Sequence, residues 1–178
     1  MILKILIAIV LALAVLAGII LWIGGRLPER HRVALALQLK QSPEVVFDTI
    51  SDIASATSWR NNMKSSLFLE PSADGKLRFQ QADGNGKITY RIEQSKRPNL
   101  FVTRIDDPSL PFGGTWTISI TANGDATDVE IIEDGEIRTR MFRFFARYVF
   151  GYYRSGESYL GALERKFGEK AAIRRIVL

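Results

Sequence analysis

The sequence predicts an α+β protein in which a curved antiparallel sheet wraps around a long C-terminal helix, with one transmembrane helix in front. Three observations predict this class. The N-terminus is an uncharged apolar run, the middle is a series of short segments with alternating apolar residues, and residues 138–167 combine helical periodicity with an absence of proline. The length of 178 residues suits one domain and an anchor.

The N-terminal apolar run predicts a membrane anchor in residues 1–25. Residues from Ile5 to Ile23 carry no charge, and as a helix they would span about 29 Å, close to the hydrocarbon thickness of a bilayer. Trp22 lies at the end of the run, where aromatic residues meet the membrane interface. A signal peptide cleaved after Ala17 is the alternative, but the run continues past the usual apolar core of such peptides, which favours an uncleaved anchor.

The charges on either side of the run indicate the orientation of the anchor. Lys4 precedes the run, whereas Arg26, Arg30 and Arg32 follow it. Positive charges tend to remain on the cytoplasmic side, so we expect a single-pass membrane protein with a cytoplasmic C-terminal domain. Residues 26–32 are expected to form a short polar linker that keeps this domain close to the bilayer.

Composition excludes several kinds of chemistry. The chain has no cysteine, which excludes disulfides, thiolate metal sites and cysteine nucleophiles, and its only histidine is His31. We therefore expect no metal site and no cofactor. Residues 33–137 contain 10 Lys/Arg and 15 Asp/Glu, whereas residues 138–178 contain 10 and 3, so positive charge gathers near the C-terminus. Because no nucleic-acid-binding module accompanies this charge, the expected partner is a bilayer rather than nucleic acid.

The middle of the chain is predicted to contain strands and two short helices. Residues 33–39 alternate as a first strand. Ser42 and Pro43 suit the N-cap and the first position of a helix that ends near Ser51, and residues 52–58 form a second short helix or turn. The further strands are expected over residues 63–70, 76–81, 87–94, 100–105, 115–121 and 127–137.

The stretch from Arg138 to Phe167 is predicted to be one continuous helix. Its large apolar residues recur at steps of three, four or seven and share one face: Met141, Phe145, Tyr148, Tyr152, Tyr159, Leu163 and Phe167. Gly151, Gly156 and Gly161 each cost ~1 kcal/mol inside a helix, so we expect a bend or a close approach there. Residues 169–178 are expected to form a basic tail.

Four short segments form an ordered set: residues 42–48 followed by Trp59, then 114–118, 133–137 and 159–164. In this order they resemble the SRPBCC superfamily, which includes polyketide cyclase/dehydrase-like proteins, START lipid-transfer domains and the birch-pollen-allergen fold. The resemblance covers about residues 33–168 and implies a helix-grip fold with a hydrophobic cavity between sheet and helix. It does not imply a reaction, because the superfamily holds enzymes, lipid carriers and binders.

Large aromatic residues are the candidate ligand-binding residues. They combine apolar surface with a few hydroxyl groups, a mixture that is typical of small-molecule pockets. The set comprises Trp59, Tyr90, Trp116, Phe145, Tyr148, Tyr152 and Tyr159. The alternative is a filled core in which these rings pack on one another.

Glu133 is the one candidate catalytic residue. Strand alternation places it on the same side as Val129 and Ile131, so a cavity on that side would surround its carboxylate with apolar groups and suit it to acid–base work. A small bulge would turn it outward, and the acidic run around it is otherwise typical of a solvated strand end. Arg91 and Arg104 are expected on the outer face of the sheet.

These observations together predict a membrane-anchored protein that binds a hydrophobic small molecule or lipid, such as an isoprenoid quinone or a polyketide-like compound. One alternative is a cyclase/dehydrase-type enzyme that uses Glu133 and tyrosine hydroxyls. The other is a membrane-tethered interaction module with a filled core. Binding without catalysis is the preferred hypothesis.

The start of the C-terminal helix suggests a second surface. Its arginines are Arg138, Arg140, Arg143 and Arg147. They alternate with more aromatic residues than one helix face can bury, which leaves Phe142 and Phe150 for another contact. Exposed aromatics beside arginines suit anionic headgroups, so this end is a hypothetical docking surface for the bilayer. The alternative is a solvated arginine face, with the aromatics covered by the loop of residues 106–114.

Overall fold

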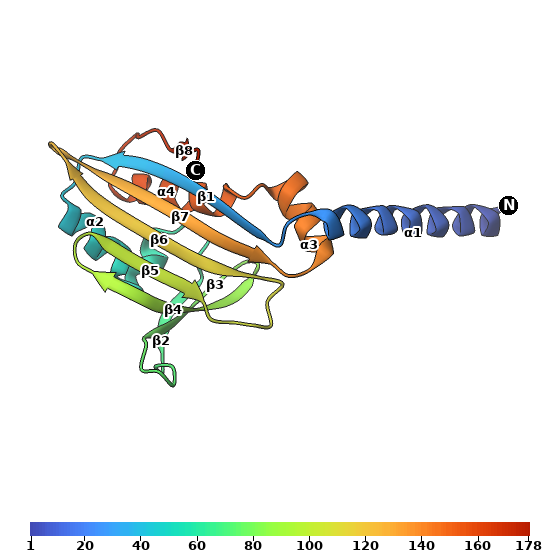
Figure 1. Cartoon of the computed structure of the whole chain (residues 1–178), viewed down its shortest axis with the longest axis horizontal. Coiled ribbons are helices and arrows are strands. Elements are labelled where there is room, and N and C mark those ends of the chain that lie inside the picture. The colour runs from blue at the N-terminus through green and yellow to red at the C-terminus, as the bar shows by residue number, and fades with distance from the viewer.

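The computed structural model describes residues 1–178 and confirms the α+β class. Eight antiparallel strands form one curved sheet in the order β2-β3-β4-β5-β6-β7-β1-β8 (Figure 1). The strands are β1 (Arg30–Leu39), β2 (Ser65–Leu69), β3 (Arg78–Asp83), β4 (Gly86–Lys96), β5 (Leu100–Ile105), β6 (Phe112–Asn123), β7 (Ala126–Ile137) and β8 (Arg174–Ile176). All the predicted strands are present, with shifted ends.

Along the chain, helical segments occur at the N-terminus, between β1 and β2, and between β7 and β8. They are α1 (Ile2–Arg26), α2 (Pro43–Ser51), the 3-10 helix η1 (Ala54–Ser58), α3 (Arg140–Phe145), the π-helical turn η2 (Ala146–Phe150) and α4 (Arg154–Lys166). Ser42 caps α2 as predicted, because its Oγ accepts a hydrogen bond from the backbone N–H of Val45 at 3.4 Å. The segment η1 then leads directly to Trp59.

The inner face of the sheet follows from strand register. Leu35 lies opposite Ile131, and Ile131 lies opposite Ile118, so three central strands present aliphatic side chains to the same side. Leu160 and Leu163 of α4 join these residues in one buried cluster, so this side holds the core. The helix-grip architecture is therefore present, with α4 packed across the inner face.

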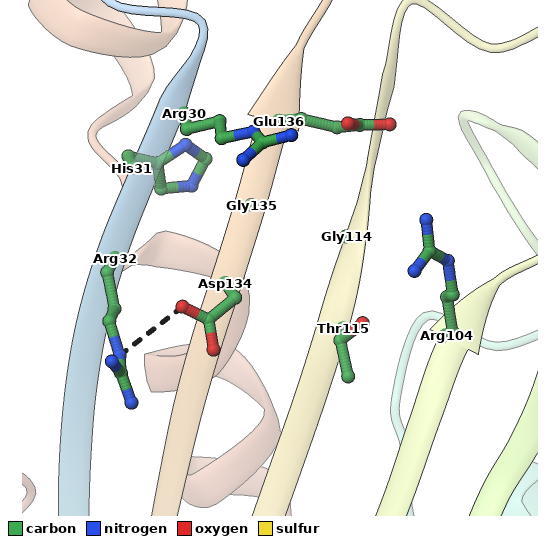
Figure 2. A pocket seen from close by; sticks show the side chains of 9 residues that line it. All are labelled: Arg30, His31, Arg32, Arg104, Gly114, Thr115, Asp134, Gly135 and Glu136. Carbon is green, nitrogen blue, oxygen red and sulfur yellow. Dashed lines mark ion pairs between the residues drawn. The ribbon is translucent and has the colours of Figure 1, made fainter.

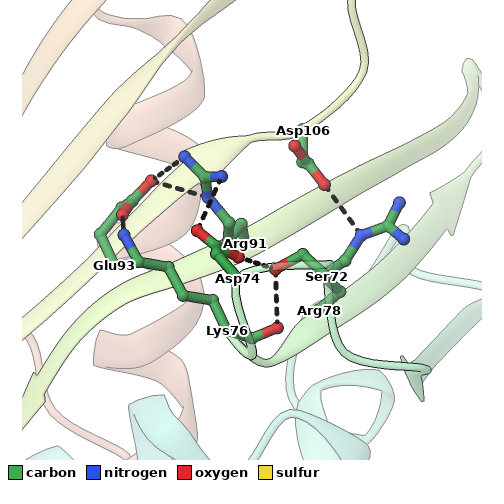
Figure 3. A network of polar contacts seen from close by, with 7 residues as sticks. All are labelled: Ser72, Asp74, Lys76, Arg78, Arg91, Glu93 and Asp106. Carbon is green, nitrogen blue, oxygen red and sulfur yellow. Dashed lines mark hydrogen bonds and ion pairs between the residues drawn. The ribbon is translucent and has the colours of Figure 1, made fainter.

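Around β3 and β4 the outer face of the sheet carries a network of ion pairs. Figure 3 shows Arg91 between Glu93 and Asp74, at 2.7 and 3.6 Å, while Arg78 pairs with Asp106 at 2.8 Å. A hydrogen bond from Lys76, with further help from Arg91, holds the pKa of Glu93 below its usual value. The predicted outward position of Arg91 is therefore correct.

The prediction of one continuous helix over residues 138–167 is wrong. The helical segment is divided at Gly151, whose φ of 76° lies in the left-handed region that glycine adopts readily. Only α4 grips the sheet, whereas α3 packs against the N-terminal helix α1 and η2 continues from α3. Gly156 marks a close approach, because a Cβ there would lie 2.5 Å from Cδ1 of Leu35. Gly151 therefore marks a break in the helical segment, and Gly156 marks a tight contact with the sheet.

Two predicted boundaries also differ from the structure. β1 begins at Arg30, inside the segment predicted as a linker, because its first residues pair with the end of β7. The predicted basic tail contains β8, in which Arg175 lies opposite Leu35 of β1. Arg175 also pairs with Glu157 of α4 at 2.7 Å, so this part of the tail is fastened to the domain.

The helix α1 is long and apolar enough to cross a bilayer, with a mean hydropathy of 3.1 over its best window. It projects from one end of the domain, and the hairpin between β6 and β7 lies at the opposite end (Figure 1). α3 packs against α1 close to the domain. Gly24 makes this contact possible, because a Cβ on Gly24 would collide with the backbone oxygen of Arg140.

Two residues near the start of α3 are less available to a membrane than the sequence suggested. Arg143 is buried; it donates to the backbone oxygen of Leu27 at 3.1 Å and pairs with Glu29 at 3.0 Å. Phe142 stacks on Phe112, at the end of the loop predicted to cover it, with ring centroids 5.5 Å apart. Both side chains therefore fasten α3 to the domain.

Candidate functional site

Four of the predicted ligand-binding residues meet on the inner face of the sheet. Tyr159 of α4 contacts Trp59 and Trp116 edge to face, with ring centroids 5.4 and 5.5 Å apart. Tyr90 stacks on Phe79 at 5.1 Å, and both pack against the same cluster. Trp59 and Tyr159 are only 6% and 8% exposed, so they are core residues. Together they form the aromatic floor of the site.

A second group of inner-face residues is half-buried beside this floor. Tyr90, Ile92 and Trp116 are partly exposed and pack against the core. Thr103 is also half-buried and lies between them, opposite Ile92 on β4 and opposite Trp116 on β6. This surface combines apolar rings with single hydroxyl groups, which suits an apolar ligand that carries a few oxygen atoms.

The tyrosine hydroxyls of the site remain protonated. Burial raises the pKa of Tyr159 to about 12, although the charge of Arg60 opposes this effect. Burial likewise raises the pKa of Tyr90. The guanidinium of Arg60 lies 5.1 Å from the centre of the Tyr159 ring and donates to Gln81 Oε1 at 2.8 Å. These groups supply hydrogen bonds and one positive charge at the edge of an aromatic floor.

Glu133 points to the inner face, as alternation predicted, and it is surrounded by donors. Its Oε2 accepts a hydrogen bond from Trp116 Nε1 at 2.8 Å and one from Ser155 Oγ at 3.3 Å. Its Oε1 lies 3.1 Å from His31 Nε2. The carboxylate therefore links α4 to three strands of the sheet, and it sits in a polar rather than a purely apolar environment.

His31 is the functional candidate that the sequence reasoning missed. Its ring stacks on Tyr152 at 4.2 Å and lies over Gly135, where a Cβ would collide with it. Extending the alternation of Val33 back by two residues places His31 on the inner face, so a signal was present. It was hidden because the residue falls in the segment predicted as a linker.

Tyr152, Phe145 and Tyr148 do not join the aromatic floor. Tyr152 is connected to the site only through His31. Phe145 ends α3 and Tyr148 lies in η2, both before the break at Gly151, and Tyr148 is 60% exposed. Their predicted place on the inner stripe of a helix is wrong, because the break at Gly151 turns this stretch away from the sheet.

A hollow of about 490 Å³ lies at the end of the sheet near α1, and its lining differs from that of the aromatic site. None of its nine lining residues is hydrophobic. Figure 2 shows Arg32 reaching toward Asp134, with which it pairs at 3.3 Å, while Arg104 lies across the sheet on β5. This hollow is a charged surface feature. The chain brings together no group of three His, Cys, Asp or Glu side chains placed to hold a metal ion.

Comparison with known proteins identifies the family. Residues 30–166 match the family described as polyketide cyclase / dehydrase and lipid transport, so the chain belongs to this family and the SRPBCC resemblance is confirmed. No curated protein matches the chain. The family match begins at the first residue of β1 and ends at the last residue of α4.

Solved structures with the same fold have low sequence identity to this chain. A START superfamily protein from Mycobacterium smegmatis is 19% identical, with a TM-score of 0.59 over 77% of this chain and 97% of that one. The di-domain ARO/CYC StfQ from the steffimycin biosynthetic pathway is 12% identical, with a TM-score of 0.59 over 76% of this chain and 49% of that one. Major latex-like protein 151 from Panax ginseng is 8% identical, with a TM-score of 0.59 over 79% and 97%.

Proposed function

We propose that this chain is a membrane-anchored protein that binds a hydrophobic small molecule or lipid on the inner face of its sheet. The observation that carries the proposal is the half-buried surface of Tyr90, Ile92, Thr103 and Trp116 beside the aromatic core. Membership of a family that includes lipid transport supports the same function.

The chemistry of the site favours an extended apolar ligand with one or two oxygen atoms, as in an isoprenoid quinone or a polyketide-like compound. Rings line the surface, while Tyr90, Tyr159 and Arg60 supply donors for a carbonyl or hydroxyl oxygen. The apolar helix α1 anchors the domain beside a bilayer that contains such molecules. The arginines after α1 support a cytoplasmic position for the domain.

Trp116→Ala is expected to weaken ligand binding at least tenfold, which corresponds to about 1.4 kcal/mol. The change removes one of the two half-buried aromatic rings of this surface, leaving Tyr90, and it removes one hydrogen bond to Glu133. Titration of the full chain in detergent with a fluorescent apolar lipid analogue measures the effect. The matched control is Thr117→Ala on the opposite face of β6, which should bind like the wild type. Equal binding by the wild type and both variants would contradict the proposal.

The enzyme alternative is favoured by one specific observation, the proximity of Glu133 to His31 on the inner face. A carboxylate and an imidazole at 3.1 Å are positioned to share a proton, and general acid–base groups contribute roughly 10²–10⁴-fold to rate. If the chain is a cyclase or dehydratase, Glu133→Gln should abolish turnover of a polyketide-like substrate. Asp125→Asn, in the distant hairpin, should leave turnover unchanged. Equal activity in both variants would remove Glu133 from any catalytic role.

A further inference from the structure

We propose that α3 and η2, residues 140–150, form a docking surface that lies in the interface of the bilayer and binds anionic lipid headgroups. The proposal rests on the membrane anchoring of α1 in the proposed function. It goes further, because it assigns a separate contact with the membrane to the domain itself and fixes which end of the domain faces the bilayer.

The packing of α3 against α1 determines how deep this surface lies relative to the bilayer. Residues 1–19 of α1 are exposed, whereas Ile20 and Ile23 are half-buried and Gly24 is buried where α3 packs. Ile20 lies about 6 Å along the helix axis from Gly24 and belongs to the uncharged run. Any bilayer that contains this run therefore reaches the level of α3. The guanidinium of Arg26, 3.7 Å from the Trp22 ring, lies at the same level.

The side chains that α3 and η2 leave exposed suit a membrane interface. Met141, Tyr148, Val149 and Phe150 are all exposed, with Val149 at 59%. They come from a short stretch at the end of the domain from which α1 projects (Figure 1). Aromatic and aliphatic side chains gathered on a helical surface partition into the headgroup region of a bilayer.

The charges of this stretch indicate the type of headgroup. Arg140 and Arg147 are exposed, and neither forms an ion pair within the chain. The neighbouring Arg138 and Arg143 are already paired with Glu136 and Glu29. Two free guanidinium groups beside an apolar surface attract phosphate groups that carry net negative charge.

The absence of cysteine allows a direct test with the full chain. A polarity-sensitive fluorophore is attached to Val149→Cys or, as a control, to Asp125→Cys at the opposite end of the domain. The protein is reconstituted in vesicles that contain lipids with quenchers near the headgroups. We expect strong quenching at position 149 and little at position 125. Quenching at 149 should be greater in vesicles with anionic lipid than in neutral vesicles.

A charge variant and a sedimentation measurement separate the possible outcomes. Arg147→Glu should lower the quenching at position 149 in anionic vesicles, whereas Lys96→Glu, at the distal end of β4, should not. If the protein sediments with the vesicles but the label at 149 is no more quenched than the label at 125, docking is overturned and the anchor stands. Equal quenching in both vesicle types would overturn the preference for anionic headgroups. Failure to sediment would overturn the anchor itself, and with it the proposed function.

Discussion

Tyr159→Ala is expected to lower the free energy of unfolding of the sheet domain by about 3–5 kcal/mol, the usual cost of truncating a buried aromatic side chain. The ring is 8% exposed and contacts Trp59 and Trp116 edge to face. Its removal leaves a cavity between α4 and two separate parts of the chain. Urea unfolding of the full chain in detergent, followed by tryptophan fluorescence, measures the loss.

Tyr159→Phe is the matched control for this prediction. It retains the ring and removes a hydroxyl whose raised pKa arises from burial, with no hydrogen bond contributing. The expected loss is therefore below about 1 kcal/mol. A similar loss for both variants would show that the hydroxyl, and not the packing of the ring, stabilises this part of the fold. A loss below about 1 kcal/mol for the alanine variant would contradict the central position of Tyr159 in the core.

Gly24→Leu is expected to separate α3 from α1. A Cβ at this position collides with the backbone oxygen of Arg140, which cannot move without displacing α3. The hydrogen bond from Arg143 to Leu27, which lies three residues beyond Gly24, should then be lost as well. Hydrogen exchange of the full chain in detergent should show faster exchange across residues 140–150 and little change in the central strands β6 and β7.

Gly18→Leu provides the control within the same helix. No atom lies within 4 Å of a Cβ at this position, and the residue is exposed on α1. Both variants add the same side chain to the apolar run, so a difference between them reports the contact with α3. Unchanged exchange in Gly24→Leu would contradict the role of the Gly24 contact in holding α3.

The sheet could be predicted from the sequence because its signals are local. Alternation along residues 127–137 placed Val129, Ile131 and Glu133 on one side, and the register of β7 with β1 and β6 confirms that this side is the core. The Ser42 cap likewise depends on a few neighbouring residues. These elements fold as their own sequences indicate.

The C-terminal helix was harder to predict because its packing depends on tertiary contacts. Periodicity continues through Gly151, and a glycine in a helical pattern costs only ~1 kcal/mol, so the sequence alone did not decide between a bend and a break. In the structure the segment is broken at Gly151, and α3 before the break packs on Gly24 of α1, a contact with a residue remote in sequence that no local pattern predicts. The same remoteness explains why the sequence predicts Phe145 and Tyr148 in the pocket and Arg143 on the docking surface.

The arrangement of the candidate site could be predicted only in part, because some of its residues follow local patterns and others depend on remote contacts. Trp116 and Glu133 belong to strands with clear alternation, and the structure brings them within 2.8 Å. His31 reaches Glu133 only because β1 extends to Arg30 and because Gly135 leaves room for its ring. Alternation along β1 is a local signal for the position of His31, but the space that Gly135 leaves for its ring depends on a strand that is remote in sequence.

Native mass spectrometry of the full chain, purified gently from the cells that make it, tests the central claim most directly. Thr103→Trp adds a large ring to the half-buried surface between Ile92 and Trp116, where we place the ligand. Thr117→Trp adds the same ring to the opposite face, beside Val102 and Ile132. The account predicts that the wild type and Thr117→Trp retain an apolar molecule and that Thr103→Trp loses it. Absence of any retained molecule in the wild type, or equal retention in both variants, would contradict ligand binding on the inner face.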